Sequence, residues 1–443
     1  MREIFSDRAR LQGILDFESA LARAESHAGV IPPSAADVIK KHCDAQHFSY
    51  SELAEAASAA GNIAIPIVSA LRRRVANENA KAAEFVHWGA TSQDAIDTGL
   101  VLQIRRGVAL LDADAGRLAT ALAKLAAKHA TTPILGRTWL QPAVPITFGL
   151  TAVGWLGAVE RSRKQLAQAA RAASAIQLGG AAGSLAALGD RGLDVAQSLS
   201  RELSLELPSL PWHAHRDRIV NLGAALGVLI GALGKIARDI SLLMQSEIGE
   251  VSEPAAPGRG ISSTMPQKHN PVACAAALAA ATRAPGLVAT LFAGMPQEHQ
   301  RGLGGWQAEW DTLPELFVLA AGALGPLTGV AEGLVVNTAR MRQNIDATHG
   351  LVMAESVTMA LTPSVGREAA ISLVEAAIQR ALDQRIQLRA ALGGDAEVSR
   401  HLTPPLLDQI FSLDDHVKAA ERLVERALAE STVRLKPDTT ERV

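Results

Sequence analysis

Aromatic residues are scarce in this chain: they make up 3% of its 443 residues, although 48% of the residues are hydrophobic. Strands favour aromatic and β-branched side chains, whereas the alanine and leucine that predominate here suit close helix–helix packing. A chain of this length exceeds one compact core, which indicates two or three domains. The composition therefore predicts an all-α protein of several helical domains.

The chain also has few cysteines and little net charge, and its first residues do not resemble a leader segment. Two cysteines, Cys43 and Cys274, cannot form a disulfide framework, and neither has metal-ligand spacing around it. The formal net charge of −2 gives no basic surface for nucleic acid. Residues 1–5 (MREIF) lack the apolar stretch of a signal peptide. We therefore expect a cytoplasmic protein with no metal and no nucleic-acid partner.

A long hydrophobic run extends from Ile219 to Ala237, with glycines at every fourth position from Gly223 to Gly231. Such spacing also occurs where membrane helices pack closely. However, Asn221 and Lys235 interrupt the run, and roughly 20 clean residues are needed to span a bilayer. We expect a buried helix of a soluble bundle and no membrane partner.

Long helices are expected in the middle of the chain. Apolar residues alternate spacings of four and three from Ile104 to Leu125, which predicts a long helix packed nearly parallel to its neighbours. Similar patterns follow Pro145, run from about residue 218 to 248, start again at Pro271 and cover residues 312–336. Four or five such helices imply a central bundle.

The domain organisation follows from these long patterns. We assign residues 1–95 to an N-terminal helical domain, 96–345 to the central bundle and 346–443 to a C-terminal helical domain. Several of the long helices are apolar nearly all round, and a single bundle cannot bury helices on every side. We therefore expect subunits to associate through them.

Three polar stretches interrupt the helical pattern, and the first is residues 87–94 (HWGATSQD). Thr91 and Asp94 have the spacing of a capping box at the start of the long helix. A helix N-terminus offers free N–H groups and a positive dipole end, and hence a carboxylate site. The stretch fits a capped helix with a packed His87 equally well.

The other two stretches are residues 136–142 (GRTWLQP) and 253–271. The former, taken alone, is a turn between helices with one arginine. The glycines and prolines of the latter exclude a regular helix and suggest a mobile loop that closes over a substrate. Asn270 followed by proline is a helix start, and a serine near Lys268 and helix N-termini is suited to proton transfer. A plain surface loop with a helix cap is the alternative.

Residues 262–271 (SSTMPQKHNP) resemble the signature loop of the fumarase/aspartase superfamily, Gly-Ser-Ser-x-Met-Pro-x-Lys-x-Asn-Pro. The other two stretches match the further conserved regions of that superfamily, in the right order and spacing, so the resemblance covers nearly the whole chain. It implies three helical domains, a central long-helix bundle, a homotetramer and active sites built from three subunits. No cofactor is implied.

The resemblance assigns roles to single residues. Ser262 matches the catalytic serine, and Lys268 and Asn270 match residues that hold the carboxylate beside the carbon that exchanges a proton. Thr91 and Ser92 match carboxylate binders. The implied substrate contacts as a whole are His87, Thr91, Ser92, Arg137, Thr138, Trp139, Gln141, His215, Ser263, Met265 and Arg301.

Two departures from the superfamily pattern narrow the expected reaction. Fumarase-like members carry a histidine where this chain has Trp139, and an acidic partner where it has Ala275. That pair helps a poor leaving group, whereas a carboxylate leaving group needs no such help because its conjugate acid has a pKa of roughly 4. The runs 87–94 and 304–310 (GGWQAEW) resemble those of bacterial 3-carboxy-cis,cis-muconate cycloisomerases. The resemblance implies cofactor-independent lactonisation of a tricarboxylate to 4-carboxymuconolactone in protocatechuate degradation.

Other interpretations stay open. One alternative is that the substrate is a related muconate, such as 3-sulfomuconate. A second is that the protein catalyses an elimination of the adenylosuccinate or argininosuccinate type. A third is that the chain is a silent helical scaffold without enzymatic activity. Ile261 replaces the first glycine of the signature, which we expect to stiffen the loop or alter its closure, and we expect relatives to carry a short N-terminal lead before the first helix that this chain lacks. The spacing of His213 and His215 does not indicate a metal site. Residues 216–218 (RDR) predict a structural ion-pair cluster.

Overall fold

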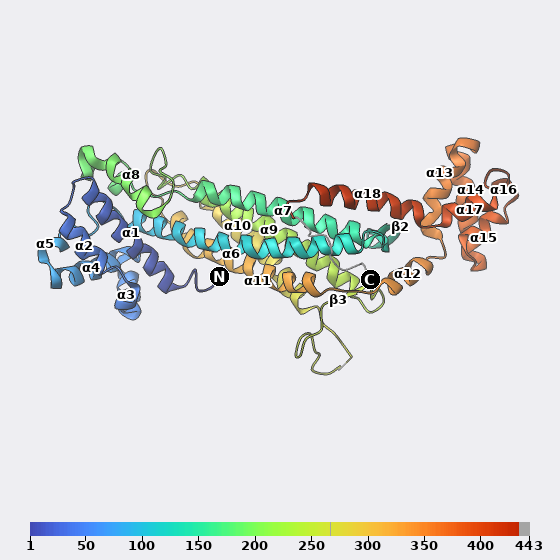
Figure 1. Cartoon of the computed structure of the whole chain (residues 1–443), viewed down its shortest axis with the longest axis horizontal. Helices are drawn as coiled ribbons and strands as arrows, with labels where there is room; N and C mark the ends of the chain where they lie inside the picture. The colour runs from blue at the N-terminus through green and yellow to red at the C-terminus, as the bar shows by residue number, and fades with distance from the viewer. Residues whose placement is uncertain (266, 434–443) are drawn as a thin grey trace, which may run out of the picture. The chain divides into compact units, whose positions relative to one another are not determined.

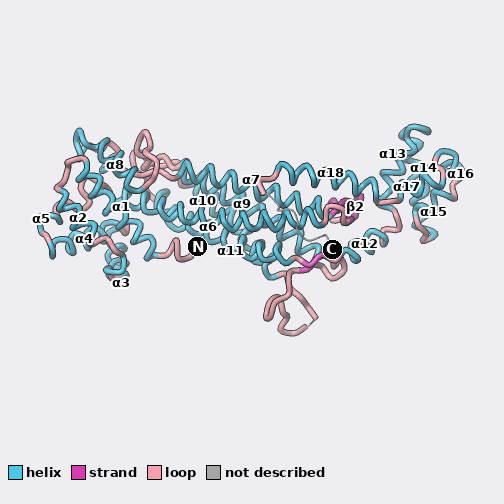
Figure 2. Tube along the Cα trace, in the orientation of Figure 1, coloured by secondary structure: helices cyan, strands magenta, loops and turns pink. Residues whose placement is uncertain are grey.

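The computed structural model describes residues 1–265 and 267–433, which fall into two compact units. Pro266 of the signature loop and residues 434–443 of the predicted C-terminal domain lie outside the described residues. Helices make up most of both units (Figure 2), which confirms the all-α class. Unit 1 comprises Met1–Asp114, Ser162–Gly231 and Ala279–Leu324, and unit 2 comprises Ala115–Arg161, Ala232–Leu278 and Gly325–Val443.

The long helices predicted from the apolar pattern are present. They are α6 (Ser92–Lys128), α7 (Phe148–Ala173), α9 (Asp217–Leu243), α10 (Val272–Ala293) and α11 (Gly305–Gly333). The last begins at Gly305 and not near residue 312, because Trp306 and Glu309 of its first turns are themselves buried. The three domains predicted with boundaries at residues 95 and 345 stay a prediction.

Unit 1 contains the short N-terminal helices (Figure 1). Within it α1 packs against α2 and α8, and α4 packs against α3 and α5. Close packing of the long helices depends on glycine: a Cβ at Gly223 of α9 would lie 2.1 Å from the Leu291 side chain of α10. The short helices are α1 (Asp7–His27), α2 (Pro33–Lys41), α3 (Tyr50–Ala60), α4 (Ala64–Glu78), α5 (Ala80–Ala83) and α8 (Gly192–Leu203).

Unit 2 contains the C-terminal helices and two short antiparallel strand pairs. Helices α13 to α17 share one apolar core built on residues such as Val357, Leu361 and Val374 (Figure 1). These helices and their neighbours are α12 (Thr338–Asp346), α13 (Ala354–Val365), α14 (Arg367–Gln384), α15 (Leu388–Gly393), α16 (Ala396–His401), α17 (Pro404–Phe411) and α18 (Asp414–Glu430).

The second polar stretch of the sequence is a β-hairpin. Strand β1 (Pro133–Thr138) pairs antiparallel with β2 (Gln141–Thr147), and residues 139–140 make the turn. The sequence predicted only a turn between helices here, and that prediction is incomplete because the residues on both sides of the turn pair as strands. A second antiparallel pair joins β3 (Val251–Ser252) to β4 (Val335–Val336). The signature loop, residues 253–271, begins directly after β3.

Within residues 1–265 and 267–433, three helices are long and apolar enough to cross a membrane, as judged by length and composition alone: α9, α10 and α11. The most apolar window of α9 is 61% buried inside the protein, which agrees with the predicted buried helix. The corresponding window of α10 is only 28% buried. Much of the apolar surface of α10 is therefore exposed in the described part of the chain.

Candidate functional site

The start of α6 is fixed by the carboxylate of Asp94, which is fully buried. It accepts a hydrogen bond from the Thr91 backbone N–H at 3.0 Å, which is one half of the predicted capping box. It also accepts from the N–H groups of Gly179 and Gly180, at 3.0 and 2.9 Å. The ring of His213 lies with Nε2 2.6 Å from the same carboxylate. The loop before α6 is thus held against residues 179–180.

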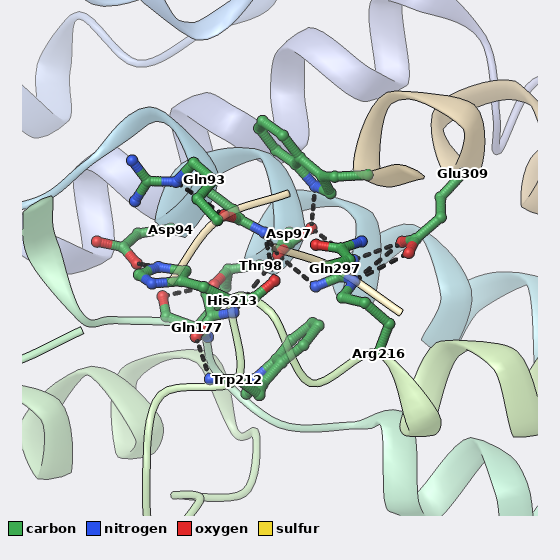
Figure 3. A network of polar contacts seen from close by, with 12 residues as sticks. Gln93, Asp94, Asp97, Thr98, Gln177, Trp212, His213, Arg216, Gln297 and Glu309 are labelled. Carbon is green, nitrogen blue, oxygen red and sulfur yellow. Dashed lines mark hydrogen bonds and ion pairs between the residues drawn. The ribbon is translucent and has the colours of Figure 1, made fainter. Parts of the chain in front are cut away.

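Arg301 lies beside the first turn of α6. Its Nε donates to the side-chain oxygen of Gln93 at 2.9 Å, and its guanidinium also donates to the Ala181 carbonyl at 3.2 Å. Because Gln93 directly follows Thr91 and Ser92, unit 1 brings Arg301 into the same region as these two predicted carboxylate-binding residues. Figure 3 shows Gln93 next to Asp94 in the polar network of this unit.

His87 is held by a residue that the sequence did not single out. Its Nδ1 lies 2.6 Å from a carboxylate oxygen of Glu18 on α1, and the Glu18 side chain is only 1% exposed. His87 itself has a left-handed backbone with φ of 61°. Burial lowers the pKa of the imidazole, but the carboxylates of Glu18 and Asp94 outweigh it, so the pKa is raised overall.

The other histidines near α9 differ in their surroundings. His213 is buried against Asp94, whereas His215 is exposed and pairs through its backbone with Pro296. No group of three or more His, Cys, Asp or Glu side chains that could hold a metal occurs among residues 1–265 and 267–433. The predicted substrate contact of His215 stays a prediction.

A buried ion network underlies the start of α6 in unit 1 (Figure 3). Arg216 is fully buried and donates to Asp97 at 2.8 and 3.1 Å and to Glu309 at 3.0 Å. Trp306 also donates to Asp97, at 3.0 Å. The ion-pair cluster predicted among residues 216–218 is therefore wrong in its partners: Arg218 donates to a backbone carbonyl, and Arg216 pairs with residues far away in the sequence.

The hairpin of unit 2 presents four of the predicted contacts. Trp139, at its tip, is 97% exposed and has a left-handed backbone with φ of 52°. Thr138 and Gln141 are also exposed and face each other in the ladder. Arg137 differs, because its guanidinium is paired with the fully buried Glu250 through two contacts of 2.8 Å. The charge of Arg137 is thus compensated, and its substrate contact stays a prediction.

The signature loop of unit 2, residues 253–271, is tied together at its base. Glu253 accepts from the N–H groups of Ala273 and Cys274, at 3.0 to 3.3 Å, at the start of α10. It also pairs with Arg259 at 3.0 Å. The carboxylate that binds the N–H groups at the start of α10 therefore belongs to Glu253 of the same chain. The sequence predicted a helix start at Asn270 but did not identify this contact.

Ser262 belongs to this loop, which follows β3 and is drawn as an irregular segment in Figure 1. Its Oγ accepts from the N–H of Met265 at 3.1 Å and, more weakly, from that of Thr264 at 3.4 Å. Both contacts stabilise negative charge on Oγ and leave the hydroxyl proton free to be donated. Lys268, Ser263 and Met265 are exposed, and no described residue forms an ion pair with Lys268.

Ile261 does not strain the loop, and its expected effect on the stiffness or closure of the loop stays a prediction. The residue that needs a left-handed backbone is Gly260, with φ of 66°, and a Cβ there would lie 2.6 Å from the Asn270 carbonyl oxygen. Ile261 forms an antiparallel bridge with His269, and its side chain is 69% exposed. An isoleucine is therefore accommodated where the signature has its first glycine.

Known proteins resemble this chain over nearly its whole length. The lyase family model matches residues 1–286, and the model of the adenylosuccinate lyase C-terminus matches residues 350–427. A 3-carboxy-cis,cis-muconate cycloisomerase of Pseudomonas aeruginosa is 55% identical over 430 residues, covering 97% of this chain and 94% of the relative. A more distant relative, a nitrosuccinate lyase of Streptomyces davaonensis, is 41% identical and covers 96% of this chain and 91% of its own.

A solved structure also resembles the chain over nearly its whole length. The 3-carboxy-cis,cis-muconate lactonizing enzyme of Pseudomonas putida superposes with a TM-score of 0.92 at 50% identity, covering 97% of this chain and 96% of that one. Both the sequence and the fold therefore agree with the resemblance carried by the signature loop. The chain belongs to the fumarase/aspartase superfamily of lyases, on its 3-carboxy-cis,cis-muconate cycloisomerase branch.

Proposed function

We propose that this protein is a cycloisomerase that converts 3-carboxy-cis,cis-muconate to 4-carboxymuconolactone in the cytoplasm, without a cofactor, during protocatechuate degradation. The observation that carries the proposal is Ser262 Oγ, held by two backbone N–H groups on an exposed loop that also carries Lys268. Trp139 and Ala275 stand where the superfamily has its histidine and acidic residue. The pair that assists a poor leaving group is absent, as suits a carboxylate nucleophile.

The reaction is an intramolecular addition. One carboxylate of the substrate attacks the carbon β to a second carboxylate and forms the lactone C–O bond. The electron pair of the C=C bond moves to the α carbon, which gives an enolate-like intermediate, and the α carbon then takes a proton. We assign the delivery of that proton to Ser262, and the stabilisation of the intermediate to Lys268 and neighbouring N–H donors.

Lys268→Ala should lower kcat by about 10²–10³, the usual cost of removing one donor that stabilises a developing oxyanion. The side chain is exposed, so folding should be unaffected. Steady-state kinetics on the purified variant measures the effect, and Gln267→Ala is the matched control on the adjacent, equally exposed loop position. Equal kinetics for the two variants would remove Lys268 from the mechanism.

We also propose a homotetramer in which each active site combines residues from several subunits. Support comes from the apolar surface that α10 leaves uncovered, including the exposed side chains of Val272 and Phe292. Obligate interfaces are rich in such residues. The exposed signature loop equally lacks a covering partner among the described residues.

Mixing two inactive variants tests the shared site. If Ser262 and Arg301 of one site come from different subunits, hybrids of Ser262→Ala and Arg301→Ala should regain about a quarter of wild-type activity by random assembly. Subunit exchange is verified by native mass spectrometry. Complete exchange without any regained activity would mean that both residues of a site come from the same subunit.

The experiment that tests the proposed reaction follows the conjugated-diene absorbance of 3-carboxy-cis,cis-muconate after addition of purified protein. We expect a decay that is unchanged by chelator. The nitrosuccinate lyase relative favours a second candidate, the elimination of a substituted succinate. No decay, together with turnover of 3-sulfomuconate, adenylosuccinate or nitrosuccinate, would replace the proposed substrate, and no turnover of any of them would favour a scaffold.

A further inference from the structure

Two carboxyl groups lie buried on one face of α1, where a helix of this kind normally carries apolar residues. Glu18 and Glu25 are 1% and 0% exposed. One oxygen of Glu18 contacts His87, whereas its other oxygen and both oxygens of Glu25 have no hydrogen-bond partner among the described residues. Burial without partners destabilises a protein, so packing alone does not explain these side chains.

The two carboxyl groups differ in charge. Burial, together with the nearby carboxylate of Glu18, raises the pKa of Glu25 to about 9. Glu25 therefore carries a proton at neutral pH, and Glu18 alone presents its carboxylate to the imidazole of His87. Glu18 and Glu25 can therefore be compared directly: Glu18 acts on His87 through its charge, whereas the protonated Glu25 does not.

The geometry of His87 leaves one ring nitrogen available. Nδ1 contacts the Glu18 carboxylate at 2.6 Å. Nε2 has no hydrogen-bond partner among residues 1–265 and 267–433, and this atom is not fully buried. The side chain is 15% exposed. His87 stands shortly before Thr91 and Ser92 in the loop that Asp94 fixes. Nε2 is therefore accessible in the region where a substrate carboxylate is expected.

The charged groups around the imidazole come from three helices. Glu18 of α1 and Asp94 of α6 favour the imidazolium, and Arg72 of α4 opposes it. Glu25 of α1 is neutral at neutral pH. A carboxylate that holds Nδ1–H both fixes the ring and favours its protonated form, in which Nε2–H is also a donor.

We propose that Glu18 is a positioning residue that holds the imidazole of His87 through Nδ1, so that Nε2 of His87 faces a carboxylate of the substrate at the start of α6. The proposal rests on the proposed function, because a tricarboxylate substrate is what requires another donor here. Arg301 already donates to Gln93 and Ala181, and Arg137 is paired with Glu250. His87 supplies a donor that no described residue occupies.

Glu18→Gln keeps the size of the side chain and removes its charge. The pKa of His87 should fall, because burial and Arg72 then outweigh the remaining Asp94 carboxylate. The imidazolium is the active form, so the high-pH limb of kcat/KM should move to lower pH. Above the new pKa, kcat/KM should drop by about 10- to 100-fold, as expected for a lost charge-assisted hydrogen bond, mainly through a higher KM.

Glu25→Gln is the matched control, because Glu25 is buried on the same helix and already neutral at neutral pH. Its pH profile and kcat/KM should equal those of the wild type. The titration of His87 is followed directly by NMR of histidine labelled at Cε1, with the resonance assigned from His87→Asn. Circular dichroism checks the fold, and His87→Asn should lose the same limb if Glu18→Gln does not fold.

The outcomes separate this inference from the proposed function. An unshifted His87 titration and pH profile in folded Glu18→Gln would overturn the positioning role and leave a purely structural one. If 3-carboxy-cis,cis-muconate is not turned over, the proposed substrate fails, while the NMR titration still tests the pair. Calorimetric binding of propane-1,2,3-tricarboxylate then tests the donor: weaker binding to Glu18→Gln than to Glu25→Gln is expected, and equal binding would contradict it.

Discussion

Ser262→Ala is expected to lower kcat by about 10²–10⁴, the usual contribution of a positioned acid–base group. The structure gives the reason: two backbone N–H groups point at Oγ, which lowers the cost of alkoxide formation and leaves the hydroxyl proton available for the α carbon. The methyl group of alanine cannot donate a proton. Because Ser262 lies on an exposed loop, the thermal unfolding midpoint should change little.

Thr264→Ala is the control for this prediction. Thr264 is an exposed hydroxyl residue of the same loop, and it contacts Ser262 through its backbone N–H, which alanine retains. Its kinetics should therefore match those of the wild type. Full activity of folded Ser262→Ala, or an equal loss in both variants, would take proton transfer away from Ser262.

Arg216→Met is expected to destabilise unit 1 by about 3–5 kcal/mol, the usual cost of removing one partner from a buried ion pair. The guanidinium is the cation between two buried carboxylates, Asp97 and Glu309. Methionine fills a similar volume but leaves both carboxylates without their counter-charge. The pKa of Glu309 is already raised, mainly by burial and against the effect of Arg216, so its proton uptake should follow the loss. Denaturant unfolding measures the change.

Arg191→Met, on the surface of the same unit, provides the comparison. Arg191 pairs with Asp194 at 3.3 Å, but their side chains are 63% and 57% exposed. Surface ion pairs contribute about 0–1 kcal/mol, so this variant should unfold close to the wild type. If both arginine variants lost the same small amount of stability, the buried network would not be holding the start of α6.

The long helices were predictable because their signal is local. Apolar residues recur at spacings of four and three along α6, and α9 contains the long hydrophobic run from Ile219 to Ala237, so each signal lies within a single segment. The contact from the Thr91 N–H to Asp94, one half of the predicted capping box, was predictable for the same reason, since the two residues lie within four positions. The hairpin was missed because Gly136 and Pro142 read as turn residues, whereas its ladder depends on pairing across that turn.

The partners of the site residues were not predictable, because each one is distant in the sequence. Glu18 holds His87 from 69 residues away, and Glu250 holds Arg137 from 113 residues away. A glutamate in an amphipathic helix is ordinarily a solvated residue, and only the fold shows that Glu18 is buried. Glu253 could have been suspected, because it precedes the start of α10 in a loop rich in proline and glycine.

Proton NMR of the reaction in D₂O is the most direct test of the proposed chemistry. With 3-carboxy-cis,cis-muconate and no added cofactor, we predict 4-carboxymuconolactone as the product, carrying one deuterium at the α carbon to which the enzyme delivers the proton. The deuterated product should not accumulate with Ser262→Ala. An unchanged substrate in the presence of folded protein, with fumarate released from a substituted succinate instead, would contradict the lactonising reaction and make the protein an eliminating lyase.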